Sequence, residues 1–143
     1  MINSVRHTGV VVRDLEKAAN FYRALGFVDF NHALEEGKFI DQVTGLIDTK
    51  LEWVKLKAPD GYLLELLKYH SHIDSSAMTL QNSNKLGCSH MAFGVDNIDK
   101  TCKIIEEMGG SIVNLPALTD DKKVKVAYCH DLEGVLMEIV EIQ

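Results

Sequence analysis

The fold is decided by two stretches of sequence, HTGVVVRDLEK at residues 7–17 and HMAFGVDNIDK at residues 90–100, which align with each other without a gap. The alignment continues as far as Gly26 in the first half and Gly109 in the second. Self-similarity of this length indicates a duplicated supersecondary unit. The chain is therefore expected to consist of two related halves.

A second pair of similar stretches lies near the end of each half, DGYLLEL at residues 60–66 and EGVLMEI at residues 133–139. The spacing between the first and second stretch is longer in the first half. The extra residues fall between Phe27 and Leu51, and we expect a substrate-facing loop at residues 31–50, because loops absorb insertions.

Both halves predict the same order of elements. A β-branched run at residues 7–12 is followed by Asp14, which suits a helix N-cap, and by apolar residues at helical spacing that stop at Gly26. The second half has an equivalent helix, capped by Asp96 or Asn97 and ended by Gly109. Strand-like runs follow at residues 51–56, 62–69, 112–115, 124–129 and 135–142, with hairpin turns at residues 59–61 and 131–134. The sequence predicts an α+β fold in which each half is βα followed by two or three strands.

Length and composition suit a single domain at residues 1–143, made of module one at residues 5–69, a polar linker at 70–86 and module two at 87–143. Fifteen Lys and Arg against 21 Asp and Glu give a formal charge of −6, which disfavours nucleic acid as a partner. No apolar stretch is long enough for a membrane span, and the first residues lack the apolar region of a signal peptide. We expect a cytoplasmic protein with no membrane partner.

The three cysteines, Cys88, Cys102 and Cys129, are odd in number and never form a C-x-x-C pair. This spacing disfavours a disulfide framework and a thiolate zinc site, so we expect three buried free thiols.

The duplication places a histidine at the start of each first strand, His7 and His90, and a glutamate in each last strand, Glu65 and Glu138. Each glutamate shares its strand face with apolar residues, where a carboxylate must be paired or bind a cation. Two imidazoles and two carboxylates also balance the charge of a divalent ion. The sequence therefore predicts a metal site with ligands His7, Glu65, His90 and Glu138.

These stretches, together with FYRALGF at residues 21–27, resemble the vicinal oxygen chelate superfamily, which includes glyoxalase I, methylmalonyl-CoA epimerase, extradiol dioxygenases, and fosfomycin and bleomycin resistance proteins. The resemblance implies paired βαβββ modules whose mixed sheets form a cup around one divalent metal. It also implies a homodimer, and the four ligand positions are those of the glyoxalase and epimerase branch.

The resemblance implies a metal-dependent lyase or isomerase acting on a small-molecule substrate. A base removes the proton next to a metal-chelated carbonyl and an enediolate forms; Glu138 is the expected catalytic base, with Glu65 as its counterpart. Nitrogen and oxygen ligands fit Ni, Zn, Co, Mn or Fe without distinguishing them. Related glutathione-dependent enzymes carry an Arg and an Asn where this chain has Val11 and Tyr69, so both glutathione anchors are missing.

Two other functions fit the same residues. His7, His90 and Glu138 would supply the triad of an extradiol-type Fe(II) dioxygenase, although a fourth ligand at Glu65 disfavours it. A non-catalytic protein that sequesters a small molecule is the second alternative.

The basic run at residues 122–125 is a further substrate-facing candidate. The remaining histidines are expected to be structural, surface or connector residues: His32, His70, His72 and His130.

Overall fold

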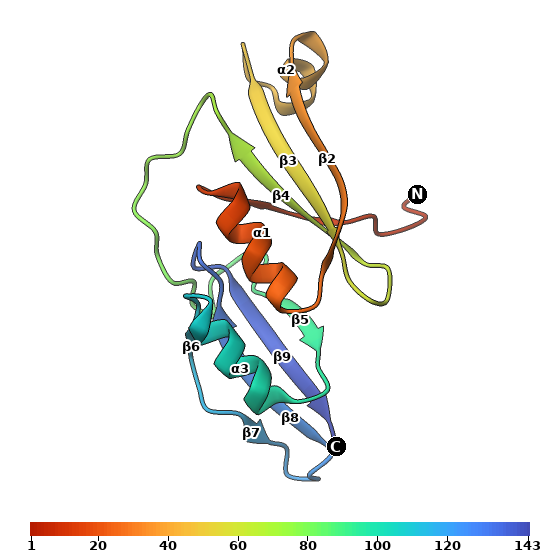
Figure 1. Ribbon diagram of the computed structural model, residues 1–143, viewed down its shortest axis with the longest axis vertical. Helices are drawn as coiled ribbons and strands as arrows, with labels where there is room; N and C mark the ends of the chain where they lie inside the picture. Colours follow the sequence, from red (N-terminus) through yellow and green to blue (C-terminus); the bar gives the residue numbers. More distant parts are fainter. The chain divides into compact units, whose positions relative to one another are not determined.

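The computed structural model describes residues 1–143, which form two compact units, Met1–Ser76 and Ala77–Gln143. Each unit has its own mixed sheet with a helix along one face, which confirms the predicted α+β fold (Figure 1). The boundary between the units falls inside the predicted linker. None of the helices is long and apolar enough to cross a bilayer.

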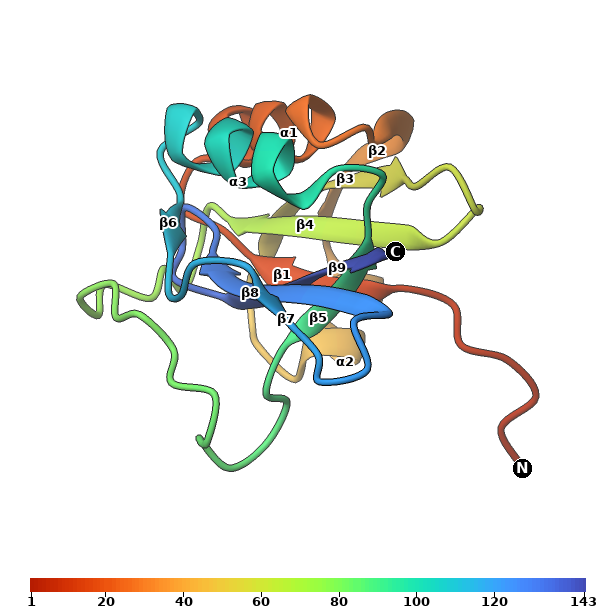
Figure 2. The same cartoon turned by 90° about the horizontal axis from the view of Figure 1, so that it is seen from below.

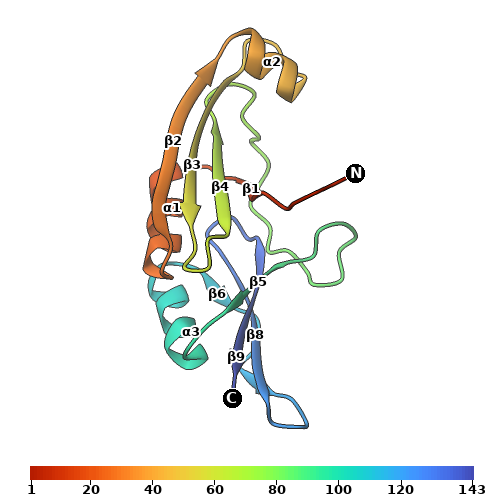
Figure 3. The same cartoon turned by 90° about the vertical axis from the view of Figure 1, so that its right-hand side faces the viewer.

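The first unit contains β1 (Thr8–Val11), α1 (Leu15–Ala24), β2 (Val28–Glu36), α2 (Lys38–Thr44), β3 (Lys50–Lys57) and β4 (Leu63–Tyr69). Its strand order is β1-β4-β3-β2, with β1 parallel to β4 and the other neighbours antiparallel. Helix α1 carries the chain from β1 at one edge of the sheet to β2 at the other. Strands β2 and β3 continue past α1 toward the short helix α2 (Figure 3). In this strand order β1 and β4, the first and last strands of the unit, are neighbours.

Helix α1 begins and ends as its sequence predicts. Asp14 Oδ1 accepts a hydrogen bond of 3.1 Å from the backbone N–H of Lys17, and Gly26 follows the C-cap with a φ of 100°. The helix buries one face: Leu15, Ala18, Ala19, Phe21 and Tyr22. That face packs on β3 and β4, whose alternating leucines, Leu56, Leu64 and Leu66, are fully buried. This apolar layer is the core of the first unit.

The second unit contains β5 (Met91–Gly94), α3 (Ile98–Glu107), β6 (Ser111–Ile112), β7 (Ala117–Leu118), β8 (Val124–His130) and β9 (Leu136–Ile142). The strand order β5-β9-β8-β6 repeats that of the first unit, with β5 parallel to β9, and β7 pairs with β8. Asn97, rather than Asp96, caps α3 by accepting a 2.8 Å hydrogen bond from the Lys100 N–H. Helix α3 covers one face of this sheet (Figure 2).

The expected loop at residues 31–50 is wrong, because this stretch holds most of β2 and all of α2. Most residues of β2 are exposed, so the strand lacks the alternation of apolar and polar residues that marks a half-buried strand. Its pairing with β3, from Val28 opposite Lys57 to Glu36 opposite Lys50, is what identifies it. The expected strand at residues 112–115 is only partly present, since β6 ends at Ile112 and β7 begins after Pro116.

The second part of the predicted linker is attached to the second unit. The Gln81 N–H donates to the Gly134 carbonyl at 3.0 Å, and His130 Nε2 donates to the Gln81 carbonyl at 2.8 Å. His130 is 5% exposed, which makes it a structural residue. Residues near Gln81 are therefore held against the turn between β8 and β9.

Gly134→Ala tests this attachment. A Cβ at Gly134 would lie 2.4 Å from the Thr79 carbonyl oxygen, and the φ of 80° strains any other residue. We expect the free energy of unfolding to fall by about 2–4 kcal/mol in urea titrations. Gly26→Ala is the control, because its φ is 100° but no atom lies within 4 Å, so it should cost about 1 kcal/mol. Equal losses in the two variants would contradict the attachment.

The expectation of three buried thiols is wrong for Cys88, which is exposed, whereas Cys102 and Cys129 are buried and free. Cys88 lies in the connector before β5, outside any helix or strand that would cover it. The other two lie on the covered faces of α3 and β8.

The three thiols should therefore react at different rates. Burial raises the pKa of the Cys129 thiol to about 12 and also raises the pKa of Cys102, so neither forms much thiolate near pH 8. A chromogenic disulfide reagent should titrate one thiol rapidly in the native protein and all three in denaturant. The rapid phase should vanish in Cys88→Ser; a rapid phase that persists there would show that a buried thiol is accessible.

Candidate functional site

The first predicted pair of ligands meets in the first unit. His7 immediately precedes β1, and Glu65 lies on β4, where the parallel register places it opposite Gly9. His7 Nε2 is 3.0 Å from Glu65 Oε2, and the Glu65 side chain is only 12% exposed. A Cβ on Gly9 would lie 3.0 Å from Leu67 Cδ1 and 4.0 Å from Glu65 Oε2, so the glycine leaves room for the pair.

Lys55 contacts the other oxygen of Glu65 and was not predicted from the sequence. It stands directly opposite Glu65 in the antiparallel pairing of β3 with β4, and its Nζ is 3.2 Å from Glu65 Oε1. The same Nζ lies 4.5 Å from the centre of the Trp53 ring, and Trp53 Nε1 donates to Glu35 Oε1 at 2.8 Å. Counting back across the turn at residues 59–61 from Glu65 would have identified Lys55.

The second predicted pair meets at equivalent positions of the second unit. His90 precedes β5, and Glu138 lies on β9 opposite Ala92. His90 Nε2 is 3.2 Å from Glu138 Oε2, and the Glu138 side chain is 24% exposed. The position equivalent to Lys55 is Tyr128, which stands opposite Glu138 and packs edge to face on the His90 ring with centroids 5.2 Å apart.

Ser89 determines which nitrogen of His90 carries the proton. The Ser89 hydroxyl donates its only hydrogen to the Ser83 carbonyl at 2.8 Å, so toward His90 Nδ1, 3.1 Å away, it acts as an acceptor. Nδ1 therefore carries a hydrogen, and in the neutral ring Nε2 presents a lone pair to the Glu138 carboxylate. Two lone pairs at this distance require either a shared proton or a bound cation between them.

The donor set fits a divalent metal ion. Imidazole nitrogen and carboxylate oxygen bind such ions at about 2.0–2.2 Å, and neighbouring ligand atoms then lie about 3 Å apart, as Nε2 and Oε2 do in both pairs. Neither unit by itself brings three His, Cys, Asp or Glu side chains into a metal-binding group. A single ion held by His7, Glu65, His90 and Glu138 thus requires one pair from each unit, and this sharing stays a prediction.

A second cluster of titratable groups lies on the other face of the first sheet. Glu52 Oε1 is 2.9 Å from His32 Nε2, and Glu52 Oε2 is 2.8 Å from His70 Nε2. His70, expected to be a connector residue, is therefore fixed to Glu52 on β3, while His72 Nδ1 is bonded to the Ser71 hydroxyl. The bonds from His70 and His32 lower the pKa of Glu52.

Glu52→Gln should destabilise the protein relative to the wild type, and the loss of stability should be larger at neutral pH than at acid pH. Because the pKa of Glu52 is lowered by folding, its contribution is complete above the ordinary carboxyl pKa and is lost as the pH falls through the lowered value. We expect a deficit of about 1 kcal/mol at pH 7 that shrinks as the pH falls through the lowered pKa of Glu52, measured by denaturant titration. A deficit independent of pH would contradict this. The exposed Glu107, changed to Gln, is the control.

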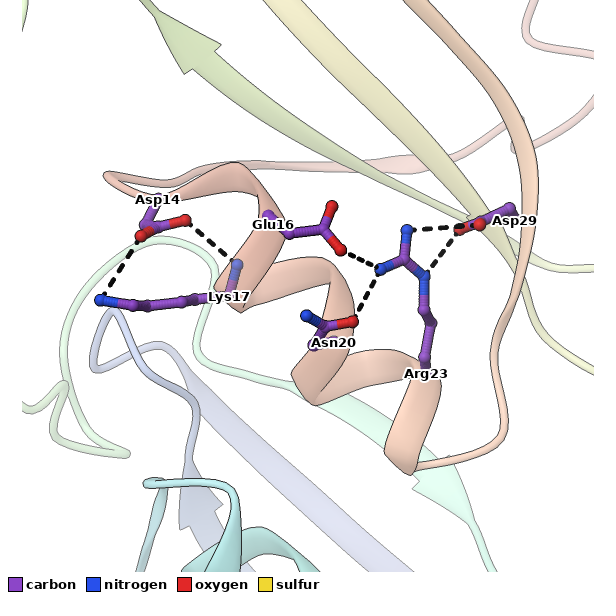
Figure 4. A network of polar contacts seen from close by, with 6 residues as sticks. All are labelled: Asp14, Glu16, Lys17, Asn20, Arg23 and Asp29. Atoms are coloured by element: carbon purple, nitrogen blue, oxygen red, sulfur yellow. Dashed lines mark hydrogen bonds and ion pairs between the residues drawn. The ribbon is translucent and has the colours of Figure 1, made fainter.

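An open cleft of about 570 Å³ in the first unit lies beside this cluster. Arg23, in its wall, donates to Asp29, Glu16 and Asn20 (Figure 4), and its hydrogen bonds to Asp29 are the main cause of its raised pKa. Val54 and Lys68 also line the cleft, and strand alternation places them on the face opposite Lys55 and Glu65. The cleft is thus separate from the His7–Glu65 pair.

A family model described as "Glyoxalase/Bleomycin resistance protein/Dioxygenase superfamily" matches residues 4–139, and the chain belongs to this superfamily. No curated protein matches the chain. A glyoxalase family protein from Bacillus cereus is similar in structure, with a TM-score of 0.91 and 23% identity over 99% of this chain and 95% of that one.

Two other solved structures are similar at lower TM-scores. A glyoxalase/dioxygenase from Nostoc punctiforme has a TM-score of 0.68 and 20% identity, over 100% of this chain and 99% of that one. A genomically encoded fosfomycin resistance protein from Listeria monocytogenes has a TM-score of 0.64 and 15% identity, over 100% and 96%. At these identities the likeness establishes the fold alone.

Proposed function

We propose that the protein is a metal-dependent lyase or isomerase that removes a proton from the carbon next to a carbonyl of a small substrate and returns it to the same molecule. One observation carries the proposal: each unit holds a His–Glu pair at equivalent strand positions, with Nε2–Oε2 distances of 3.0 and 3.2 Å. Membership of a superfamily that is largely enzymatic supports it.

His7, Glu65, His90 and Glu138 are the residues that would hold the ion. When bound, a divalent metal supplies a Lewis acid that polarises the substrate carbonyl. The donors are nitrogen and oxygen without thiolate, which suits Ni, Co, Zn, Mn or Fe(II). The proposal thus includes one divalent ion without assigning the element.

Glu138 is the proposed base. Its Oε2 lies beside His90, whereas its Oε1 has no hydrogen-bond or ion-pair partner. A carboxylate oxygen with a free lone pair accepts a substrate proton without first breaking a bond. His90, whose Nδ1 bonds to Ser89, keeps its ring in place while the proton moves.

The substrate is not expected to carry glutathione. Related glutathione-dependent enzymes use an Arg and an Asn at the positions of Val11 and Tyr69; Val11 is 55% exposed, and neither side chain supplies a charge for a carboxylate. We therefore propose a small carbonyl compound or acyl thioester in place of a glutathione adduct. The homodimer implied by the resemblance and the cytoplasmic location expected from the sequence stay predictions.

Two measurements test the function. Metal analysis of the purified protein should find about one divalent ion for each set of four ligands. Hydrogen–deuterium exchange should occur at the carbon next to the carbonyl in a panel of α-hydroxycarbonyl compounds and acyl thioesters. Glu138→Gln should slow this exchange by about 10²–10⁴-fold, because it removes the base. Glu107→Gln, at an exposed position of α3, should leave the exchange unchanged.

Other outcomes would replace the proposal. Exchange that survives in Glu138→Gln would remove Glu138 as the base. Consumption of oxygen with catechols would favour the dioxygenase, although Glu65 is bonded to both His7 and Lys55 and is poorly placed to vacate a coordination position. Tight binding of a small molecule with no metal and no exchange would favour sequestration.

A further inference from the structure

The two glutamates occupy equivalent positions but have different neighbours. Glu65 is bonded through both oxygens, Oε2 to His7 at 3.0 Å and Oε1 to Lys55 at 3.2 Å. Glu138 is bonded through Oε2 alone. Its side chain is also about twice as exposed, 24% against 12%. The duplication has therefore produced one fully restrained carboxylate and one half-restrained carboxylate.

We propose that Lys55 is a positioning residue that holds Glu65 as a fixed ligand and so leaves proton transfer to Glu138 alone. This inference rests on the proposed function and deepens it, because it assigns unequal roles to two carboxylates that the repeat makes equivalent.

Lys55 is itself held in place. Its ammonium group lies against the Trp53 ring, and the indole N–H of Trp53 is bonded to Glu35 on β2. The Lys55 side chain is 23% exposed, so its ion pair with Glu65 is shielded more than a surface pair would be. A lysine with restricted rotamers restrains its partner in turn, since the carboxylate cannot rotate without breaking a charge-assisted bond.

Tyr128 cannot restrain Glu138 in the same way. It occupies the position equivalent to Lys55, directly opposite the glutamate, but its ring packs against His90. A phenol carries no positive charge at neutral pH, and no bond joins it to Glu138. The histidine of the second pair is therefore supported on two sides, by Ser89 and Tyr128, while the glutamate keeps a free oxygen.

A single carboxylate with a free oxygen favours one class of substrate. The C–H bond next to the carbonyl breaks, its proton passes to Glu138 Oε1, and its electron pair forms a carbon–carbon double bond as the carbonyl oxygen takes the charge. The hydroxyl hydrogen of the substrate then passes to the former carbonyl oxygen, and Glu138 returns its proton to the former carbonyl carbon, so that a carbonyl and a hydroxyl have exchanged places with no net oxidation. This exchange requires an α-hydroxycarbonyl substrate. Inversion of a stereocentre by two bases would require a second carboxylate with a free oxygen on the opposite face.

Metal affinity tests the positioning role without turnover. Zn²⁺ binding is measured by competition with a chromophoric chelator in the wild type, Lys55→Met, Lys55→Arg and Lys57→Met. Loss of an outer partner of a ligand typically weakens binding about 10–100-fold. We expect this for Lys55→Met, which keeps an unbranched stem of about the same length and removes the ammonium group. Lys55→Arg keeps the charge and should stay within about threefold of the wild type. Lys57, on the same strand but exposed, is the matched control and should have no effect.

The stereochemistry of exchange in deuterium oxide is the second readout. The wild type should place deuterium on one face of the substrate, and Lys55→Met, which frees Glu65, should place it on both. Unchanged or tighter Zn²⁺ binding in Lys55→Met, or label on one face only, would overturn the role of Lys55 while leaving the proposed function intact. A wild type that binds no divalent ion would overturn both.

Discussion

A carboxylate on a largely covered strand face needs a positive partner, and the organisation of each unit depends on this requirement. An unpaired charge in such a place costs several kcal/mol, even after the surroundings relax. Glu65 and Glu138 are 12% and 24% exposed, and each meets a histidine nitrogen. Aliphatic residues at these two positions would avoid this cost. A functional role therefore explains the two His–Glu pairs better than a contribution to folding stability does.

The parallel pairing of the first and last strands brings each histidine to its glutamate. His7 and Glu65 are far apart in sequence and meet only when β1 lies beside β4; the same holds for His90 and Glu138 on β5 and β9. The helix between the first and second strands makes this pairing possible, because parallel neighbours need a long crossover. Formation of the sheet and formation of the ligand pair are therefore one event in each unit.

The duplication predicted most of the fold and placed a histidine and a glutamate at matching positions of the two halves. Hydrophobic periodicity and caps located α1 and α3, because a helix with one buried face has a clear pattern. The same sequence patterns could not locate β2, because its exposed residues show no alternation. They could not locate the attachment of Gln81 to the β8–β9 turn either, because it depends on backbone groups and on His130. Lys55 and Ser89 were missed for a similar reason: their roles depend on cross-strand register and on the direction of one hydroxyl hydrogen.

Equivalence of backbone positions does not make the two halves chemically equivalent. The repeat fixes where a histidine and a glutamate lie, but the residue opposite each glutamate differs, a lysine in one unit and a tyrosine in the other. A carboxylate with both oxygens bonded is a good ligand and a poor base, since accepting a proton would cost it an ion pair. A carboxylate with a free oxygen is the better base and the less firmly held ligand. Divergence at one cross-strand position is thus sufficient to divide binding and proton transfer between two copies of the same motif.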